Sequence, residues 1–128
     1  MLTRDRLRRI ASVWIICLVA ISLQPYRPIG SNGQLPSPAH RIEHLIAFVA
    51  TGVLLLALSR SRKREWMAAL SVLCLATGIE TAQYLLYRGA FEWWDIRDDA
   101  IGFVIAAVLN RWTSVGNLLL RERSIAIE

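Results

Sequence analysis

Two ionisable side chains, His44 and Glu80, lie inside long apolar stretches of the sequence, where charge is costly. A charged group at the centre of a membrane-spanning helix costs about 2.5–3.5 kcal/mol on insertion scales, so neither residue is expected there without a partner or a task. Histidine and carboxylate side chains together can exchange a proton or bind a polar ligand. His44 and Glu80 are therefore the candidate catalytic residues, and the residue types leave open whether a reaction occurs.

The composition predicts that these residues belong to a membrane protein. The chain has 128 residues, enough for one domain over 1–128, and 55% of them are hydrophobic, too many for a soluble domain of this size. Crossing a hydrocarbon core takes about 20 residues of helix. The predicted fold is an all-α polytopic bundle of four transmembrane helices, at about 7–26, 40–59, 66–87 and 94–112, with a short cytoplasmic tail over 113–128.

The basic residues predict the orientation of this bundle. Eleven of the fifteen lysines and arginines cluster at the N-terminus, between the second and third helices, and at the C-terminus. Such an alternating bias is what the positive-inside rule produces. Both termini are therefore expected in the cytoplasm, with the connections after the first and third helices outside. This distribution favours membrane lipids as partners and argues against nucleic acid, despite the net charge of +5.

Three of the expected helices carry polar residues toward the same outer level. At 1.5 Å per residue Glu80 lies about 21 Å beyond Trp66, and His44 lies about two turns below the outer start of its helix. Gln83 and Tyr84 share a helical face with Glu80, as Glu43 and His40 do with His44. Asp95, Asp98 and Asp99 occupy the first turn of the fourth helix, where Asp95 is expected as the N-cap and Asp98 completes a capping-box-like pair.

Two interpretations of these polar residues stay open from the residues alone. In the first, they pair with one another and fix the bundle. In the second, they line a pocket open to the outer leaflet that binds a polar head group or moves a proton. The spacing His40-Arg41-Ile42-Glu43-His44 differs from the HExxH zinc motif, and Cys17 and Cys74 form no CxxC pair, so neither a metal nor another cofactor is predicted.

The same residues resemble the short motifs of the VanZ-like family of small membrane proteins, named for a teicoplanin-resistance protein. The second helix of that family typically opens Asp-Lys-x-x-His, and here Arg41 and His44 fit, while His40 replaces the acid. Further matches are Glu80 and Gln83 in a Glu-x-x-Gln motif, Arg88 in the following turn, and Asp95, Asp99 and Gly102 at the fourth helix. The similarity spans about residues 38–110.

The resemblance implies a multi-pass protein of the bacterial cytoplasmic (inner) membrane, associated with the cell envelope and linked to glycopeptide tolerance. It supplies no reaction. The resulting hypothesis is a pocket that binds or modifies a cell-envelope component, such as a lipid-linked precursor. Its binding residues are His40, Arg41, His44, Glu80, Gln83, Tyr84, Arg88, Asp95 and Asp99. The alternative is a non-catalytic accessory or assembly subunit of a larger membrane protein complex. A transporter is disfavoured, because four helices without repeats or interruptions lack the usual transporter features.

Overall fold

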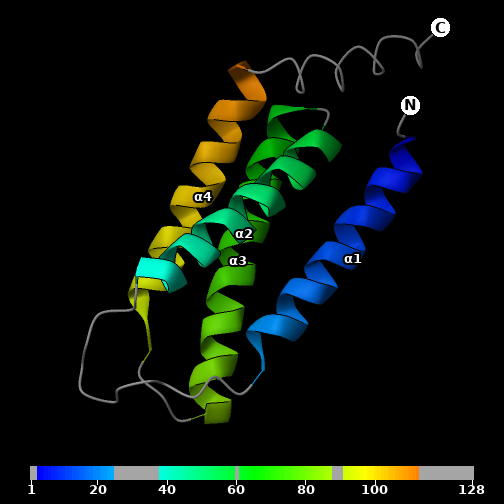
Figure 1. The fold of residues 1–128 in the computed structure, drawn as a ribbon. Coiled ribbons are helices and arrows are strands. Elements are labelled where there is room, and N and C mark those ends of the chain that lie inside the picture. Colours follow the sequence, from blue (N-terminus) through cyan, green and yellow to red (C-terminus); the bar gives the residue numbers. More distant parts are fainter. Residues whose placement is uncertain (1–2, 25–37, 60, 88–90, 113–128) are drawn as a thin grey trace, which may run out of the picture.

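The computed structural model describes residues 3–24, 38–59, 61–87 and 91–112, and within these residues it contains four α-helices and no strand. The helices are α1 (Arg4–Ser22), α2 (Pro38–Leu58), α3 (Arg62–Tyr87) and α4 (Trp93–Trp112). They alternate in direction along the bundle, so that α1 begins at the same end at which α4 finishes (Figure 1). The predicted all-α class is confirmed.

Two helices begin about a turn before their predicted starts because hydroxyl caps precede them. Thr3 Oγ1 accepts a hydrogen bond from the backbone N–H of Arg6 at 3.4 Å, so α1 also includes Arg4 and Arg6, which precede its predicted start. Ser61 Oγ accepts from the backbone N–H of Arg64 at 3.4 Å, which places the basic run after Ser61 inside α3. Helix α2 starts at Pro38, two residues before the predicted span of 40–59, and the missing N–H of proline has no helical partner to lose there.

Helices α2 and α3 are each long and apolar enough to cross a membrane. At 1.5 Å per residue the 21 residues of α2 measure about 31 Å, close to the thickness of a hydrocarbon core. All four helices leave large apolar side chains exposed, among them Ile16, Ile46, Leu85 and Val104. A surface of this kind is suited to lipid.

A small apolar core joins all four helices, with Leu18 and Val19 of α1 packed against it. Phe48 of α2 and Val72, Ala76 and Ile79 of α3 are buried together, and Phe103 of α4 packs against them. The most extensive packing is between α2 and α4. The residues of greatest chemical interest lie along this α2–α4 contact.

Candidate functional site

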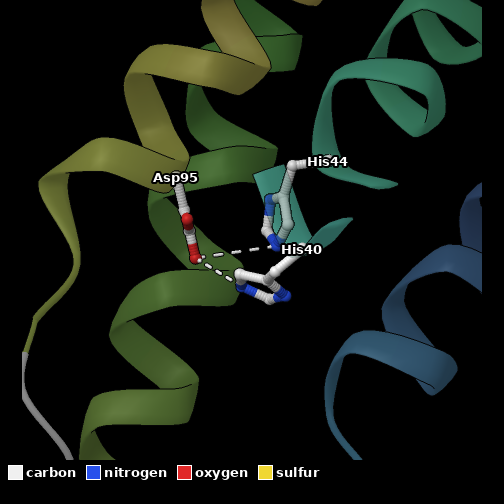
Figure 2. Close-up of side chains that lie close together, drawn as sticks. All are labelled: His40, His44 and Asp95. Carbon is white, nitrogen blue, oxygen red and sulfur yellow. Dashed lines mark hydrogen bonds and ion pairs between the residues drawn. The ribbon is translucent and has the colours of Figure 1, made fainter. Parts of the chain in front are cut away.

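Three side chains from α2 and α4 converge near the starts of these two helices. His40 Nε2 lies 3.2 Å from Asp95 Oδ2, and His44 Nε2 lies 3.6 Å from the same oxygen. Figure 2 shows both imidazole rings, one turn apart on α2, directed at that single carboxylate oxygen. The other oxygen of Asp95, Oδ1, is buried and has no hydrogen-bond partner within the described part of the chain. The three ligand atoms lie within 4.8 Å of one another, so these residues could hold a metal ion.

Asp99 orients His44 from the opposite side of its ring. Its Oδ1 lies 2.9 Å from His44 Nδ1, and the Asp99 side chain is buried. A carboxylate at this distance favours a proton on Nδ1, which leaves the Nε2 lone pair directed toward Asp95. The contact therefore fixes the orientation of the His44 ring and favours a proton on Nδ1.

Asp98 pairs with two arginines, one from α2 and one from α4. Arg41 Nε donates to Asp98 Oδ2 at 2.7 Å, and Arg97 Nη2 donates to Asp98 Oδ1 at 2.6 Å. The guanidinium of Arg97 also lies 4.5 Å from the ring centre of Trp94, within the range of a cation–π contact. Within the described part of the chain, the guanidinium groups of Arg41 and Arg97 are thus both directed at Asp98 and not at Asp95 or Asp99.

Glu80 reaches the cluster from α3. It is buried, with 4% of its surface exposed, and its Oε1 accepts a hydrogen bond from the backbone N–H of Glu92, the residue before α4. It also lies close enough to His44 and Asp95 to interact with them electrostatically. Burial, and after it the charge of Asp95, raises the pKa of the Glu92 carboxyl. The hydrogen bond of Glu80 therefore fixes the end of the α3–α4 connection beside the cluster. The carboxyl of Glu80 also adds another acid to the cluster.

Two glycines make the close approach of α2 and α4 possible. A Cβ atom added to Gly102 would lie 2.8 Å from the backbone oxygen of Leu45, and one added to Gly52 would lie 2.6 Å from the Cβ of Ala106. Real Cβ atoms essentially never approach other atoms this closely. Because Leu45 directly follows His44, the Gly102 contact sets how far the histidines stand from the aspartates of α4.

The structure does not bring every predicted site residue into this cluster. Gln83 Nε2 donates to the backbone oxygen of Ser22 at 2.8 Å, so its described bond joins α3 to the end of α1. Tyr84 is 48% exposed and contacts the ring of Phe91. Glu43 is exposed although it lies between the two histidines. Arg88 falls outside the described residues.

The expected N-cap role of Asp95 is corrected, and with it the reason for the acids of α4. The helix begins at Trp93, so Asp95 already lies in its first turn, and its backbone N–H bonds to the carbonyl of Glu92 at 3.1 Å. The carboxylate is directed at the histidines instead of the helix end. Asp98, which the sequence predicted to complete a capping-box-like pair, binds the guanidinium of Arg97 instead.

The charges at this end of the bundle do not balance. Five carboxylates gather there, from Glu80, Glu92, Asp95, Asp98 and Asp99, against the guanidinium groups of Arg41 and Arg97. Since both guanidinium groups pair with Asp98, the two imidazole rings are the only other ionisable donors near the remaining four acids within the described part of the chain. Such an arrangement favours a positively charged ligand or a polar ligand that donates hydrogen bonds.

Comparison with protein-family models gives a match to VanZ/LLP1 over residues 8–114. The chain belongs to the VanZ/LLP1 family. Searches of curated proteins and of solved structures gave no match. The match includes all the described residues of α2, α3 and α4, so the whole cluster lies within the VanZ/LLP1 region. Together with the two apolar helices, membership of this family indicates a membrane protein.

Proposed function

We propose that this VanZ/LLP1 protein binds or modifies a polar cell-envelope component at the cluster formed by α2, α3 and α4. The observation that carries the proposal is the burial of Glu80, Asp95 and Asp99 beside two histidines in an otherwise apolar bundle. Burying charge in such surroundings costs free energy unless it is offset, and functional sites are where this cost is commonly retained.

The proposed topology places this site at the outer face of the membrane. All four helices would cross, with both termini in the cytoplasm and the connection from α3 to α4 outside. The exposed indole rings support this arrangement: Trp93 is the first residue of α4, where the cluster lies, whereas Trp112 is the last residue of α4 and Trp66 lies near the start of α3. Tryptophan favours the two membrane interfaces. The outer leaflet is where lipid-linked envelope precursors would present their head groups.

The proposed roles follow from the geometry. His44, held by Asp99, would offer Nε2 to a ligand, and the buried Glu80 would act as the acid or base. Because Arg41 and Arg97 are directed at Asp98, an anionic head group would not meet a guanidinium group of α2 or α4 directly. The ligand is therefore expected to bring hydroxyl, amide or ammonium donors, or to arrive together with a cation.

The experiment that tests this proposal compares His44→Gln and Glu80→Gln with the wild type. Each protein is expressed in a glycopeptide-susceptible bacterium, its membrane level is measured by immunoblotting, and the teicoplanin concentration that inhibits growth is determined. Wild-type protein is expected to raise that concentration, and both variants are expected to lose the effect at equal protein level. The matched control is Glu43→Gln, which neutralises an exposed acid next to His44. Full activity of a stably inserted Glu80→Gln variant would refute the proposed role of the cluster.

A second candidate function, that of an accessory subunit, is favoured by one face of α3. Thr77, Gly78 and Thr81 line an open groove there, and a Cβ atom added to Gly78 would meet no atom within 4 Å. Small residues let helices approach closely in membranes, so a helix of a different membrane protein would fit this face. Purification in a gentle detergent separates the two candidates. A stoichiometric partner protein, lost in a Gly78→Leu variant, favours the subunit, whereas a lone chain with bound envelope lipid favours the first proposal.

A further inference from the structure

We propose that His40, His44 and Asp95 form a binding site for one divalent transition-metal ion, with Zn²⁺ as the best match. This inference goes beyond the proposed function, because a metal can occupy the cluster whether or not an envelope component reaches it. It also departs from the sequence-based expectation that no metal binds, which rested on the absence of an HExxH motif. Here the third ligand comes from a different helix, and no local motif could encode it.

Two of the three separations between the ligand atoms match those around a tetrahedral ion. Zinc bonds of about 2.0–2.1 Å to nitrogen or oxygen place neighbouring ligand atoms about 3.3–3.4 Å apart. The two separations to Asp95 Oδ2 are 3.2 Å from His40 Nε2 and 3.6 Å from His44 Nε2. All three atoms lie within 4.8 Å of one another, so side-chain rotations that draw the two imidazole nitrogens together would be needed for all three to bond one ion.

The unused oxygen of Asp95 argues for a ligand site over a pair of simple ion pairs. Asp95 is 4% exposed, and its Oδ1 makes no hydrogen bond to any described residue. Two ion pairs would each be best served by an oxygen of their own, yet both imidazole rings approach Oδ2 (Figure 2). Two imidazole nitrogens gathered at one buried carboxylate, which has a second oxygen to spare, form a group of ligand atoms that a shared cation could bind.

Side chains that contact the ligand residues also support a metal site. Metal-binding histidines commonly donate the proton of their other ring nitrogen to a carboxylate, which fixes the tautomer and raises the basicity of the ligand. Asp99 stands in that relation to His44, at 2.9 Å from Nδ1. A dipositive ion would also offset the excess of carboxylates that Arg41 and Arg97 leave uncompensated.

Two imidazole nitrogens and one carboxylate oxygen are the donor set of three-ligand zinc sites, which keep a fourth position for water or substrate. With such an ion bound, the site would gain a Lewis acid able to meet an anionic or carbonyl group, which the acid-rich cluster alone repels. Glu80 lies near enough to interact electrostatically with a group in this position.

The test uses the full chain, purified in detergent through a histidine-free tag and stripped with a chelator. ZnCl₂ is added, unbound metal is removed, and zinc per chain is measured by plasma mass spectrometry, while affinity is measured by calorimetry. We expect one zinc ion per wild-type chain and loss of that ion in His44→Gln and Asp95→Asn. Asp99→Asn, which removes only the positioning carboxylate, is expected to weaken affinity about 10- to 100-fold. Glu43→Gln is the matched control and should bind as the wild type does.

A second measurement needs only the wild-type protein, so it does not depend on whether the variants fold. Co²⁺ in place of Zn²⁺ should give the intense visible absorption of a tetrahedral site, and the absorption should disappear when Zn²⁺ is added. Since His40 and His44 are the only histidines of the chain, no other imidazole pair can produce this signal. Absence of stoichiometric zinc and of the cobalt band in the folded wild type would overturn the inference. Equal zinc binding by folded Asp95→Asn and wild type would overturn it as well. Either result would leave the proposed envelope function to be judged by its own growth assay.

Discussion

The close crossing of α2 and α4 provides a sharp test of how the site is positioned, through the substitution Gly102→Ala. The new Cβ would lie 2.8 Å from the backbone oxygen of Leu45 and 3.1 Å from both the Cβ of Phe48 and the backbone nitrogen of Val49. Since two of these three atoms belong to the backbone, a change of rotamer cannot relieve the contact. Raising 2.8 Å to 3.4 Å, where ordinary contact begins, requires the helices to separate by about 0.6 Å.

Separating the two helices would lower the stability of the bundle and would also lengthen a contact within the cluster. Overpacking of a well-packed contact typically costs about 1–3 kcal/mol, so the free energy of unfolding should fall by about this amount. The same displacement would lengthen the 2.9 Å contact of His44 with Asp99 toward about 3.5 Å, at which a hydrogen bond is largely lost. Gly102→Ala is therefore expected to weaken both the bundle and ligand binding at the cluster.

The assay is thermal unfolding in detergent followed by tryptophan fluorescence, with Gly78→Ala as the matched control. Gly78 also lies inside a helix, but an added Cβ there meets no atom within 4 Å. Replacing it by alanine should stabilise the protein by about 0.4–1 kcal/mol, through the lower entropy of the unfolded chain. The two substitutions are thus expected to shift the melting temperature in opposite directions. An equal or higher melting temperature for Gly102→Ala than for Gly78→Ala would refute the inferred crossing.

Two further predictions concern single contacts outside the metal ligands. Burial raises the pKa of Glu92, so the folded state binds the proton of this carboxyl more tightly than the unfolded state does. The protonated carboxyl therefore favours folding below the ordinary pKa of 4.5, and this stabilisation is lost as the pH rises through the folded pKa. Glu92→Gln should therefore raise the melting temperature at pH 7, with a gain that shrinks toward pH 4, and a gain independent of pH would contradict this. Trp14→Phe removes the 2.9 Å hydrogen bond from Trp14 Nε1 to the buried Thr51 Oγ1 and should cost about 0.5–1.5 kcal/mol. The control Trp112→Phe, at a ring that is 84% exposed, should leave unfolding unchanged, and equal effects of the two substitutions would argue against the α1–α2 contact.

Much of the architecture could be predicted because helix length and apolar content are properties of single segments. The start of α2 at Pro38 follows from the chemistry of that one residue. The earlier start of α3 depends on Ser61, whose hydroxyl caps a run of basic residues that was expected to form a loop. Charge pattern suggested a connection there, and a local hydrogen bond extended the helix into it.

Helical periodicity placed His44, Glu80 and Asp95 at a common level, but it could not say which atoms meet. The convergence of both histidines on one oxygen of Asp95 depends on the separation of α2 and α4, which Gly102 and Gly52 set across the contact. Periodicity also grouped Gln83 with Glu80 on one face. The described bonds of these two side chains go instead to different neighbours, Ser22 at the end of α1 and Glu92 before α4. Which neighbour a helical face meets is a tertiary property, and a single sequence encodes it only weakly.

The central claim is that the His40–His44–Asp95 cluster is built to receive a ligand and is not a network that stabilises the bundle. The most direct test is the melting temperature of metal-free Asp95→Asn compared with that of the metal-free wild type. Asparagine keeps the size and polarity of the side chain and removes one of the carboxylates beside the imidazole rings, so a ligand site predicts an unchanged or higher melting temperature. If the cluster were a structural network, loss of the charge on which both histidines converge would destabilise the protein by about 3–5 kcal/mol. A melting temperature lowered by that amount would contradict the account.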